Sequence, residues 1–128
     1  MVTKYVDIDG KWGVLINWDF DESDWEDISA LLFSFGMNHR GINRSLHILS
    51  THNSGMAISN DDLRMTSIYI GKASSTAQWW STLVHELKHC VDAIIDYYGE
   101  TLAGEPSAYT IGYLMLRVVQ EIAEPCSN

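Results

Sequence analysis

Basic residues, cysteines and long apolar runs are all scarce in this 128-residue chain, and each shortage argues against a class of protein. Only eight lysines and arginines accompany a formal net charge of −9, whereas nucleic-acid-binding proteins usually present a basic face. Two cysteines are too few for a disulfide framework. No apolar run approaches the ~20 residues that span a membrane. We therefore expect neither nucleic acid nor membrane as a partner.

The N-terminal stretch MVTKYVDIDGKWG lacks the apolar segment of a signal peptide. Together with the unpaired cysteines, this favours a soluble protein of the cytoplasm. Apolar residues make up 46% of the chain, which is enough for a core of its own. The length fits one ordinary domain, so we expect residues 1–128 to fold as a single domain. The negative charge is interpreted as an aid to solubility.

The N-terminal part of the chain predicts both strands and a helix. Residues 5–18 alternate loosely around an Asp-Gly pair, which is typical of a hairpin. A helix is expected within residues 19–36, because apolar residues recur at helical spacing from Trp25 to Phe35 and Gly36 follows. Three later segments, separated by turns, are strand-like: residues 45–50, 55–59 and 64–73.

The C-terminal part predicts two helices with no strand between them. The first is expected at 76–98. It begins after Ser75, and the glutamine three residues after Ser75 gives the spacing of a capping box. It ends at Gly99, a residue type that suits a helix C-terminus. The second lies within residues 104–122 and has Pro106 in its first turn, where proline is tolerated. This order of elements favours an α+β fold over a doubly wound parallel sheet.

The first of these helices contains the sequence HELKH, in which His85 and His89 are four residues apart. On a helix they lie on one face, one turn apart, so both imidazoles can reach one ion. Glu86 lies to the side of the pair, where it can take a proton from a metal-activated water. The pattern H-E-x-x-H is therefore typical of a zinc site with a built-in general base. A pair of structural histidines is the alternative.

Two histidines alone make a poor tetrahedral zinc site, so a third protein ligand is expected downstream. Asp92 and Asp96 continue the same helical face but are too short to bend back, and Asp92 is better suited to accept an imidazole N–H. Glu100 lies about 15 Å further along the helix. Glu105 opens the next helix, and a turn before it would aim its carboxylate at the ion. Close helix packing without a metal is the alternative explanation for the small residues that follow Glu105.

The sequence HELKH followed by GEPSAYTIGY resembles the gluzincin branch of the zinc metallopeptidases over residues 75–118. The resemblance implies zinc held by His85, His89 and Glu105, with Glu86 activating water. It also implies a zincin-like minimal domain: a small twisted, mostly antiparallel sheet with one helix packed on it, then the active-site helix and a C-terminal helix. The short chain and the GEPxAYxxGY motif resemble those of small zincin-like proteins of bacteria and their phages.

In such a fold the edge strand beside the active-site helix binds an extended peptide or protein substrate, and residues 65–72 are expected to form that strand. The chain departs from the large thermolysin-like enzymes, because it lacks their NExxSD motif and has no room for their second domain.

Several other residues have two interpretations each. Tyr109, four residues after the expected third ligand, can donate a hydrogen bond to a developing oxyanion, or it can line the core or the cleft. His47 and His52 are interpreted as surface or loop histidines, with a second site as the alternative. Cys90 is expected to be a buried, inert thiol facing away from the histidine pair. The tryptophan pair at 79–80 is expected to pack the first turns of the long helix, and the alternative is that one of the rings lines a cleft.

These observations support two functions of different classes. The first is zinc-dependent hydrolysis of a peptide bond by a metal-activated water, with Glu86 as general base. The second is a non-catalytic module, in which zinc, or the relic of a zincin site, stabilises a small domain used for protein interaction. A structural zinc site needs no base and usually closes its fourth position with another ligand, often cysteine. The presence of Glu86 therefore favours the enzyme.

Overall fold

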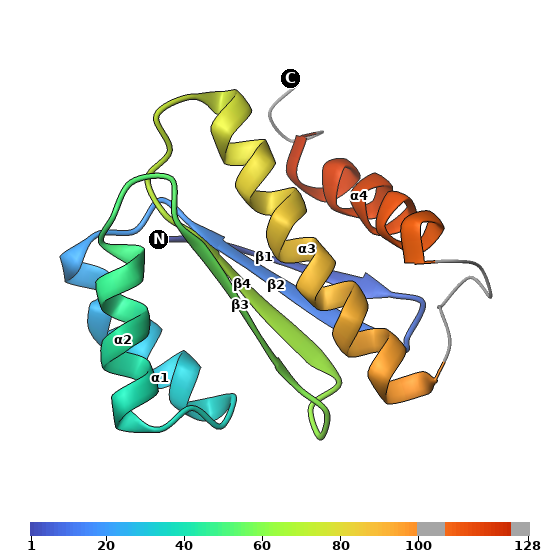
Figure 1. The fold of residues 1–128 in the computed structure, drawn as a ribbon, viewed down its shortest axis with the longest axis horizontal. Coiled ribbons are helices and arrows are strands. Elements are labelled where there is room, and N and C mark those ends of the chain that lie inside the picture. The colour runs from blue at the N-terminus through green and yellow to red at the C-terminus, as the bar shows by residue number, and fades with distance from the viewer. Residues whose placement is uncertain (100–106, 124–128) are drawn as a thin grey trace.

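The computed structural model describes the backbone of residues 1–99 and 107–123 and shows an α+β fold (Figure 1). Its sheet has four strands in the order β1-β2-β4-β3. Two of the three pairings are antiparallel, and β2 runs parallel to β4. The predicted α+β class with a mostly antiparallel sheet is confirmed. The strands are β1 (Val2–Ile8), β2 (Trp12–Trp18), β3 (Gly55–Asn60) and β4 (Met65–Ile70).

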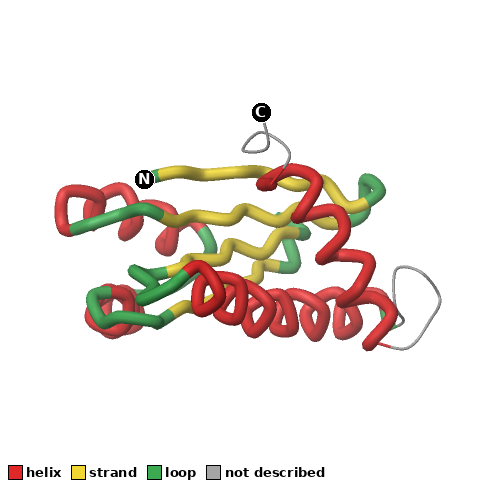
Figure 2. Tube along the Cα trace, turned by 90° about the horizontal axis from the view of Figure 1, so that it is seen from above, coloured by secondary structure: helices red, strands yellow, loops and turns green. Residues whose placement is uncertain are grey.

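Two pairs of helices accompany the sheet. The 3₁₀ turn η1 and helices α1 and α2 lie between β2 and β3 in the chain, and α3 and α4 follow β4. Figures 1 and 2 show α3 and α4 side by side across one face of the sheet. No helix in the described ranges is long and apolar enough to cross a membrane. The bounds are η1 (Glu22–Asp24), α1 (Trp25–Ser34), α2 (His39–Leu49), α3 (Thr76–Tyr98) and α4 (Ser107–Ala123).

The sheet has an apolar cluster on each face because side chains alternate along its strands. Ile68 and Ile70 of β4 belong to the main core, together with residues of β1, β2, α3 and α4. Tyr69, between them, belongs to a second cluster formed with α1 and α2. The main core thus fixes α3 against the sheet, and the second cluster fixes the helix pair α1–α2 against its other face.

Helix α3 has the bounds that the sequence predicts. The Ser75 hydroxyl accepts a hydrogen bond of 3.1 Å from the Gln78 N–H at its start. Gly99 has a φ of 75° at its end, and its N–H donates to the Ile95 carbonyl over 2.7 Å. A left-handed residue of this kind favours glycine, because a side chain would be strained there.

One predicted strand is wrong, because residues 45–50 belong largely to α2. The Asn38 side chain caps this helix by accepting a 2.9 Å hydrogen bond from the Gly41 N–H. Ile42, Ser45 and Leu49 are buried at helical spacing, which packs one face of α2. His47 therefore lies on an exposed helix surface rather than on a strand.

The predicted edge strand is also wrong. Strand β4 lies between β2 and β3, and its residues Thr66–Ile70 are buried on both faces of the sheet. The edge next to α3 is β3, whose residues are all half-buried and which contacts α3 directly. Strand β4, which directly precedes α3 in the chain, is thus interior. Strand β3, which precedes β4, lies beside the motif.

Candidate metal centre

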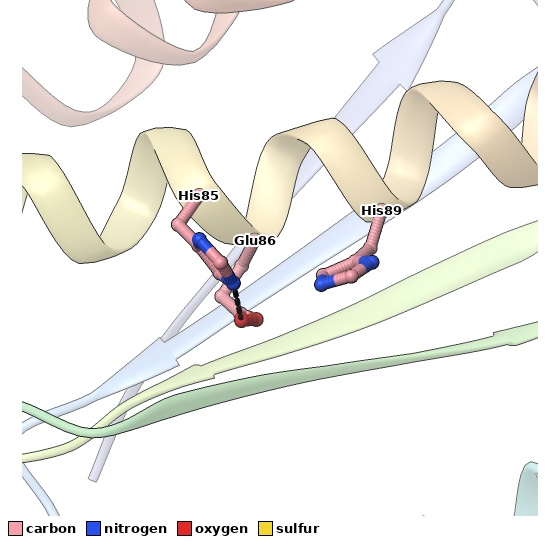
Figure 3. A group of neighbouring side chains, drawn as sticks. All are labelled: His85, Glu86 and His89. Atoms are coloured by element: carbon pink, nitrogen blue, oxygen red, sulfur yellow. Dashed lines mark ion pairs between the residues drawn. The ribbon is translucent and has the colours of Figure 1, made fainter.

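The side chains of His85, Glu86 and His89 converge on the side of α3 that faces β3 (Figure 3). One potential ligand atom from each lies within 4.8 Å of the other two. The two imidazole rings are 5.2 Å apart between centroids, and His85 Nε2 lies 3.8 Å from Glu86 Oε1. Two nitrogens that share a zinc ion are at most about 4 Å apart. Small side-chain rotations bring both imidazoles onto one ion, so this group can hold a metal.

The three residues differ sharply in burial. The His85 side chain is 71% exposed, and His89 is exposed as well, whereas the Glu86 side chain is only 5% exposed. Successive residues on a helix point about 100° apart, so Glu86 turns under the histidines towards the sheet. A Cβ atom at Gly55 of β3 would lie 3.2 Å from the Glu86 Cγ. The missing side chain at this glycine therefore makes room for the buried carboxyl.

The Glu86 carboxyl has an unsatisfied oxygen. Its Oε2 is buried and has no hydrogen-bond partner in the described part of the chain. Burial raises the pKa of Glu86, and charge on the imidazoles of His85 and His89 acts in the opposite direction. Leaving a buried carboxyl oxygen unpaired is costly unless a ligand or cation satisfies it.

Two clefts, of about 290 and 580 Å³, meet at Gly55, His85 and Glu86, and together we name them the α3–β3 groove. The motif thus lies at the middle of an open channel between the helix and the sheet edge. The smaller cleft is completed by Asn53, Gln78, Ser81 and Thr82. The larger is completed by Met56, Ala57, Ser59, His89, Asp92, Ala93 and Asp96. The sequence gives no signal for the part played by Gly55, whereas Asp96 is recognisable as a continuation of the histidine face.

Two of the predicted site residues cannot be placed with the motif. Glu105 lies outside the described residues, and only the backbone of Tyr109 is described, in the first turn of α4. The described part of α4 packs against α3 and β1, on the side of α3 away from β3 (Figures 1 and 3). Their roles as third zinc ligand and oxyanion donor stay predictions.

The predicted role of Asp92 is corrected. Its carboxylate forms an ion pair with the Lys88 ammonium, one turn earlier on α3. No hydrogen bond joins it to either imidazole within residues 1–99 and 107–123. A flexible lysine four residues away on the same face is the nearer partner for this exposed carboxylate. Asp92 therefore lines the groove without orienting a histidine.

The burial of Cys90 and the exposure of His47 and His52 are as the sequence predicts. Cys90 is fully buried in the main core, and burial raises the pKa of its thiol to about 11. His47 and His52 are exposed, on α2 and in the turn after it.

The tryptophan pair also packs as predicted. The Trp79 and Trp80 rings meet edge to face, with centroids 4.9 Å apart. Trp79 also lines a cleft of about 390 Å³ with Trp18 and Phe20, near the start of α3.

Comparison of the chain with protein-family models, with curated proteins and with solved structures found no match. The chemistry of the site therefore has to be argued from its own residues.

Proposed function

We propose that this protein is a zinc-dependent peptidase of the gluzincin type, with His85 and His89 as zinc ligands and Glu86 as general base. The observation that carries the proposal is the state of Glu86. A carboxyl that is nine-tenths buried has one oxygen without a partner, at the junction of two clefts and beside two exposed imidazoles. Of the buried polar atoms without a hydrogen-bond partner in the described residues, the Glu86 oxygen is the one that belongs to a carboxyl beside two potential metal ligands, where burial without a partner costs most.

The donor atoms favour zinc over other common ions. Imidazole nitrogens suit zinc and neighbouring transition metals, whereas calcium and magnesium take mostly oxygen ligands. Zinc sites that do chemistry keep three protein ligands and one open position. His85 and His89 supply two of these ligands from the exposed face of α3, and Glu105 is the predicted third.

Each described residue of the motif has a separate task in this proposal. When bound, zinc would polarise the substrate carbonyl and lower the pKa of a water molecule. Glu86 accepts the proton from that water and delivers it to the leaving amine. The α3–β3 groove holds the peptide in an extended form beside β3, which takes the place of residues 65–72 as the substrate-binding edge.

The geometry of the histidine pair supports an enzyme over a zinc-stabilised interaction module. A structural zinc ion stabilises a small domain by joining different segments of the chain through closed coordination. His85 and His89 lie on the same helix, one turn apart, and both face solvent. With Glu105 as the predicted third ligand, an ion on these two residues would still keep a fourth position open to a substrate, unlike a closed structural site.

The test is hydrolysis of a randomised peptide library by the zinc-loaded protein, with cleavage products identified by mass spectrometry. We expect cleavage that a chelator abolishes and that returned zinc restores. Glu86→Gln should lower the rate by at least about 100-fold while keeping zinc, because glutamine has the same shape and cannot act as a base. Glu121→Gln, at an exposed position on α4, is the matched control and should cleave like the wild type.

Two outcomes would contradict the proposal. Cleavage by Glu86→Gln at the wild-type rate would remove Glu86 from the role of base. A wild-type protein that holds zinc and cleaves nothing in the library would leave the interaction module as the better account.

A further inference from the structure

The α3–β3 groove has an uneven distribution of charge. On one side of the histidine pair it is lined by uncharged polar groups, among them Asn53, Gln78 and Ser81. On the other side it is lined by two carboxylates, Asp92 and Asp96. No lysine or arginine lines either cleft within the described part of the chain. A ligand that fills the groove therefore meets negative charge at one end only.

The two carboxylates differ in how far they are already neutralised. Asp92 forms an ion pair with Lys88, so part of its charge is compensated. Asp96 is exposed and has no ion pair or hydrogen bond among the described residues. It is the carboxylate that remains available to a ligand.

A purely structural role does not explain Asp96. It lies in the last turn of α3, which contains no basic residue. The C-terminal end of a helix carries partial negative charge, so a carboxylate there is unfavourable and a basic side chain is the stabilising choice. The same negative end adds to the attraction that Asp96 exerts on a cation in the groove.

The groove also shows independently that it is built to receive a ligand. The Oε2 atom of Glu86 is buried, has no partner among the described residues, and belongs to a residue that lines both clefts. An unpaired buried oxygen of this kind calls for a group that is supplied from outside the fold.

We propose that the groove selects peptides with a lysine or arginine side chain near the scissile bond, and that Asp96 is the residue that recognises it. This inference rests on the proposed function and adds the substrate class. Asp96 is seven residues beyond His89, or about 10 Å along the helix axis. An extended peptide covers that distance in about three residues. The basic residue should therefore lie within about three positions of the cleaved bond, on the side of the groove that Asp96 lines.

The experiment compares the cleavage products of a randomised peptide library for zinc-loaded wild type, Asp96→Asn and Asp96→Lys. The wild type should enrich lysine and arginine at one position near the cleaved bond by about five-fold, the strength of one well-placed ion pair. Asp96→Asn should remove that enrichment and Asp96→Lys should replace it with aspartate and glutamate. Asp27→Asn, an exposed change on α1, is the matched control and should keep the wild-type preference.

Three results would overturn the inference without contradicting the proposed hydrolytic function. These are wild-type cleavage with no basic preference, a preference that survives in Asp96→Asn, and loss of zinc from Asp96→Asn, which would make Asp96 a metal ligand. Zinc content is measured on every variant, so the last case is distinguished from the others.

A second measurement separates this inference from the proposed function. Fluorescence anisotropy reports binding of labelled lysine-rich and glutamine-rich peptides of equal length, whether or not they are cleaved. Tighter binding of the lysine peptide that weakens in Asp96→Asn and at high salt supports recognition by the groove, even if no peptide is hydrolysed. Equal binding of both peptides contradicts it.

Discussion

Gly55 of β3 and Thr82 of α3 approach so closely that a Cβ atom on the glycine would lie 2.5 Å from the Thr82 Cγ2. The same atom would lie 3.2 Å from the Glu86 Cγ and 3.2 Å from the Tyr69 carbonyl oxygen. Threonine is branched at Cβ and cannot swing its methyl group away freely. The distance between the helix and the sheet edge, and with it the position of the general base, therefore depends on a glycine at residue 55.

Gly55→Ala should destabilise the fold by roughly 1–3 kcal/mol, because the added methyl group overpacks the contact between α3 and β3. It should also lower any hydrolytic rate by displacing Glu86. Urea unfolding measures the first effect. Thr82→Ala in the same chain removes the opposing methyl group and should recover part of the loss.

Gly112→Ala is the matched control for that substitution. Apart from its chain neighbours and the backbone of its own helix, no atom of the described residues lies within 4 Å of a Cβ placed at Gly112, which is on α4. Alanine is the better helix former, so this variant should gain up to about 1 kcal/mol. Equal stability of Gly55→Ala and the wild type would show that the contact with Thr82 is looser than described.

Tyr69→Phe should stabilise the protein by about 1 kcal/mol. The Tyr69 hydroxyl is buried in the second apolar cluster and is poorly satisfied, because the nearby Ser67 side chain does not complete a hydrogen bond of good geometry with it, so its removal relieves a costly group. Tyr113→Phe provides the contrast, because the Tyr113 hydroxyl donates to the Asp9 carboxylate over 2.9 Å. A large loss of stability in Tyr69→Phe, measured by urea unfolding, would mean that this hydroxyl has a partner.

The buried thiol of Cys90 predicts a loss of stability in alkali. Burial raises the pKa of this thiol from 9.0 to about 11 in the folded protein. Between these values the unfolded state has lost the proton that the folded state keeps, so the free energy of unfolding falls as the pH rises. The free energy of unfolding is unaffected by the titration of this thiol well below pH 9. At pH 10.5 the titration of the thiol should have lowered it by about 2 kcal/mol.

Urea unfolding of the wild type and Cys90→Ala at pH 8 and pH 10.5, in reducing buffer, measures that contribution. The stability difference between the two proteins should shrink at the higher pH, because only the wild type carries the buried thiol. A constant difference would contradict the burial of a protonated thiol.

Glu105→Gln should weaken zinc binding by orders of magnitude, because it removes the predicted third ligand of a site that needs three. Glu100→Gln is the control, since the sequence places that carboxylate too far along the chain to coordinate. Titration of metal-free protein with zinc, against a competing chelator, measures both. Unchanged affinity in Glu105→Gln would move the third ligand elsewhere and leave the two histidines in place.

Several features of the fold follow from local signals in the sequence. Ser75 and Gly99 mark both ends of α3 because a hydroxyl cap and a left-handed glycine act within one turn of the chain. The hairpin of β1 and β2 follows from an Asp-Gly turn between alternating residues. The histidine pair and the buried Cys90 follow from helical periodicity alone, since the side of a helix is fixed by residue spacing.

Features that depend on contacts between distant segments do not follow in the same way. Residues 45–50 alternate like a strand, and the cap at Asn38 that makes them helical lies seven residues earlier. The order of the strands is set by the parallel pairing of β2 with β4 across η1, α1, α2 and β3, which no local pattern reports. The role of Gly55 appears only once β3 is placed against Thr82 of α3.

The central claim is that His85 and His89 hold one zinc ion, and the most direct test is the zinc content of purified, dialysed protein. We predict one zinc per chain in the wild type and essentially none in His85→Ala or His89→Ala. His47→Ala, which removes an exposed histidine from α2, should keep the wild-type content. Full zinc content in His85→Ala and His89→Ala, or none in a wild type supplied with excess zinc, would contradict the account.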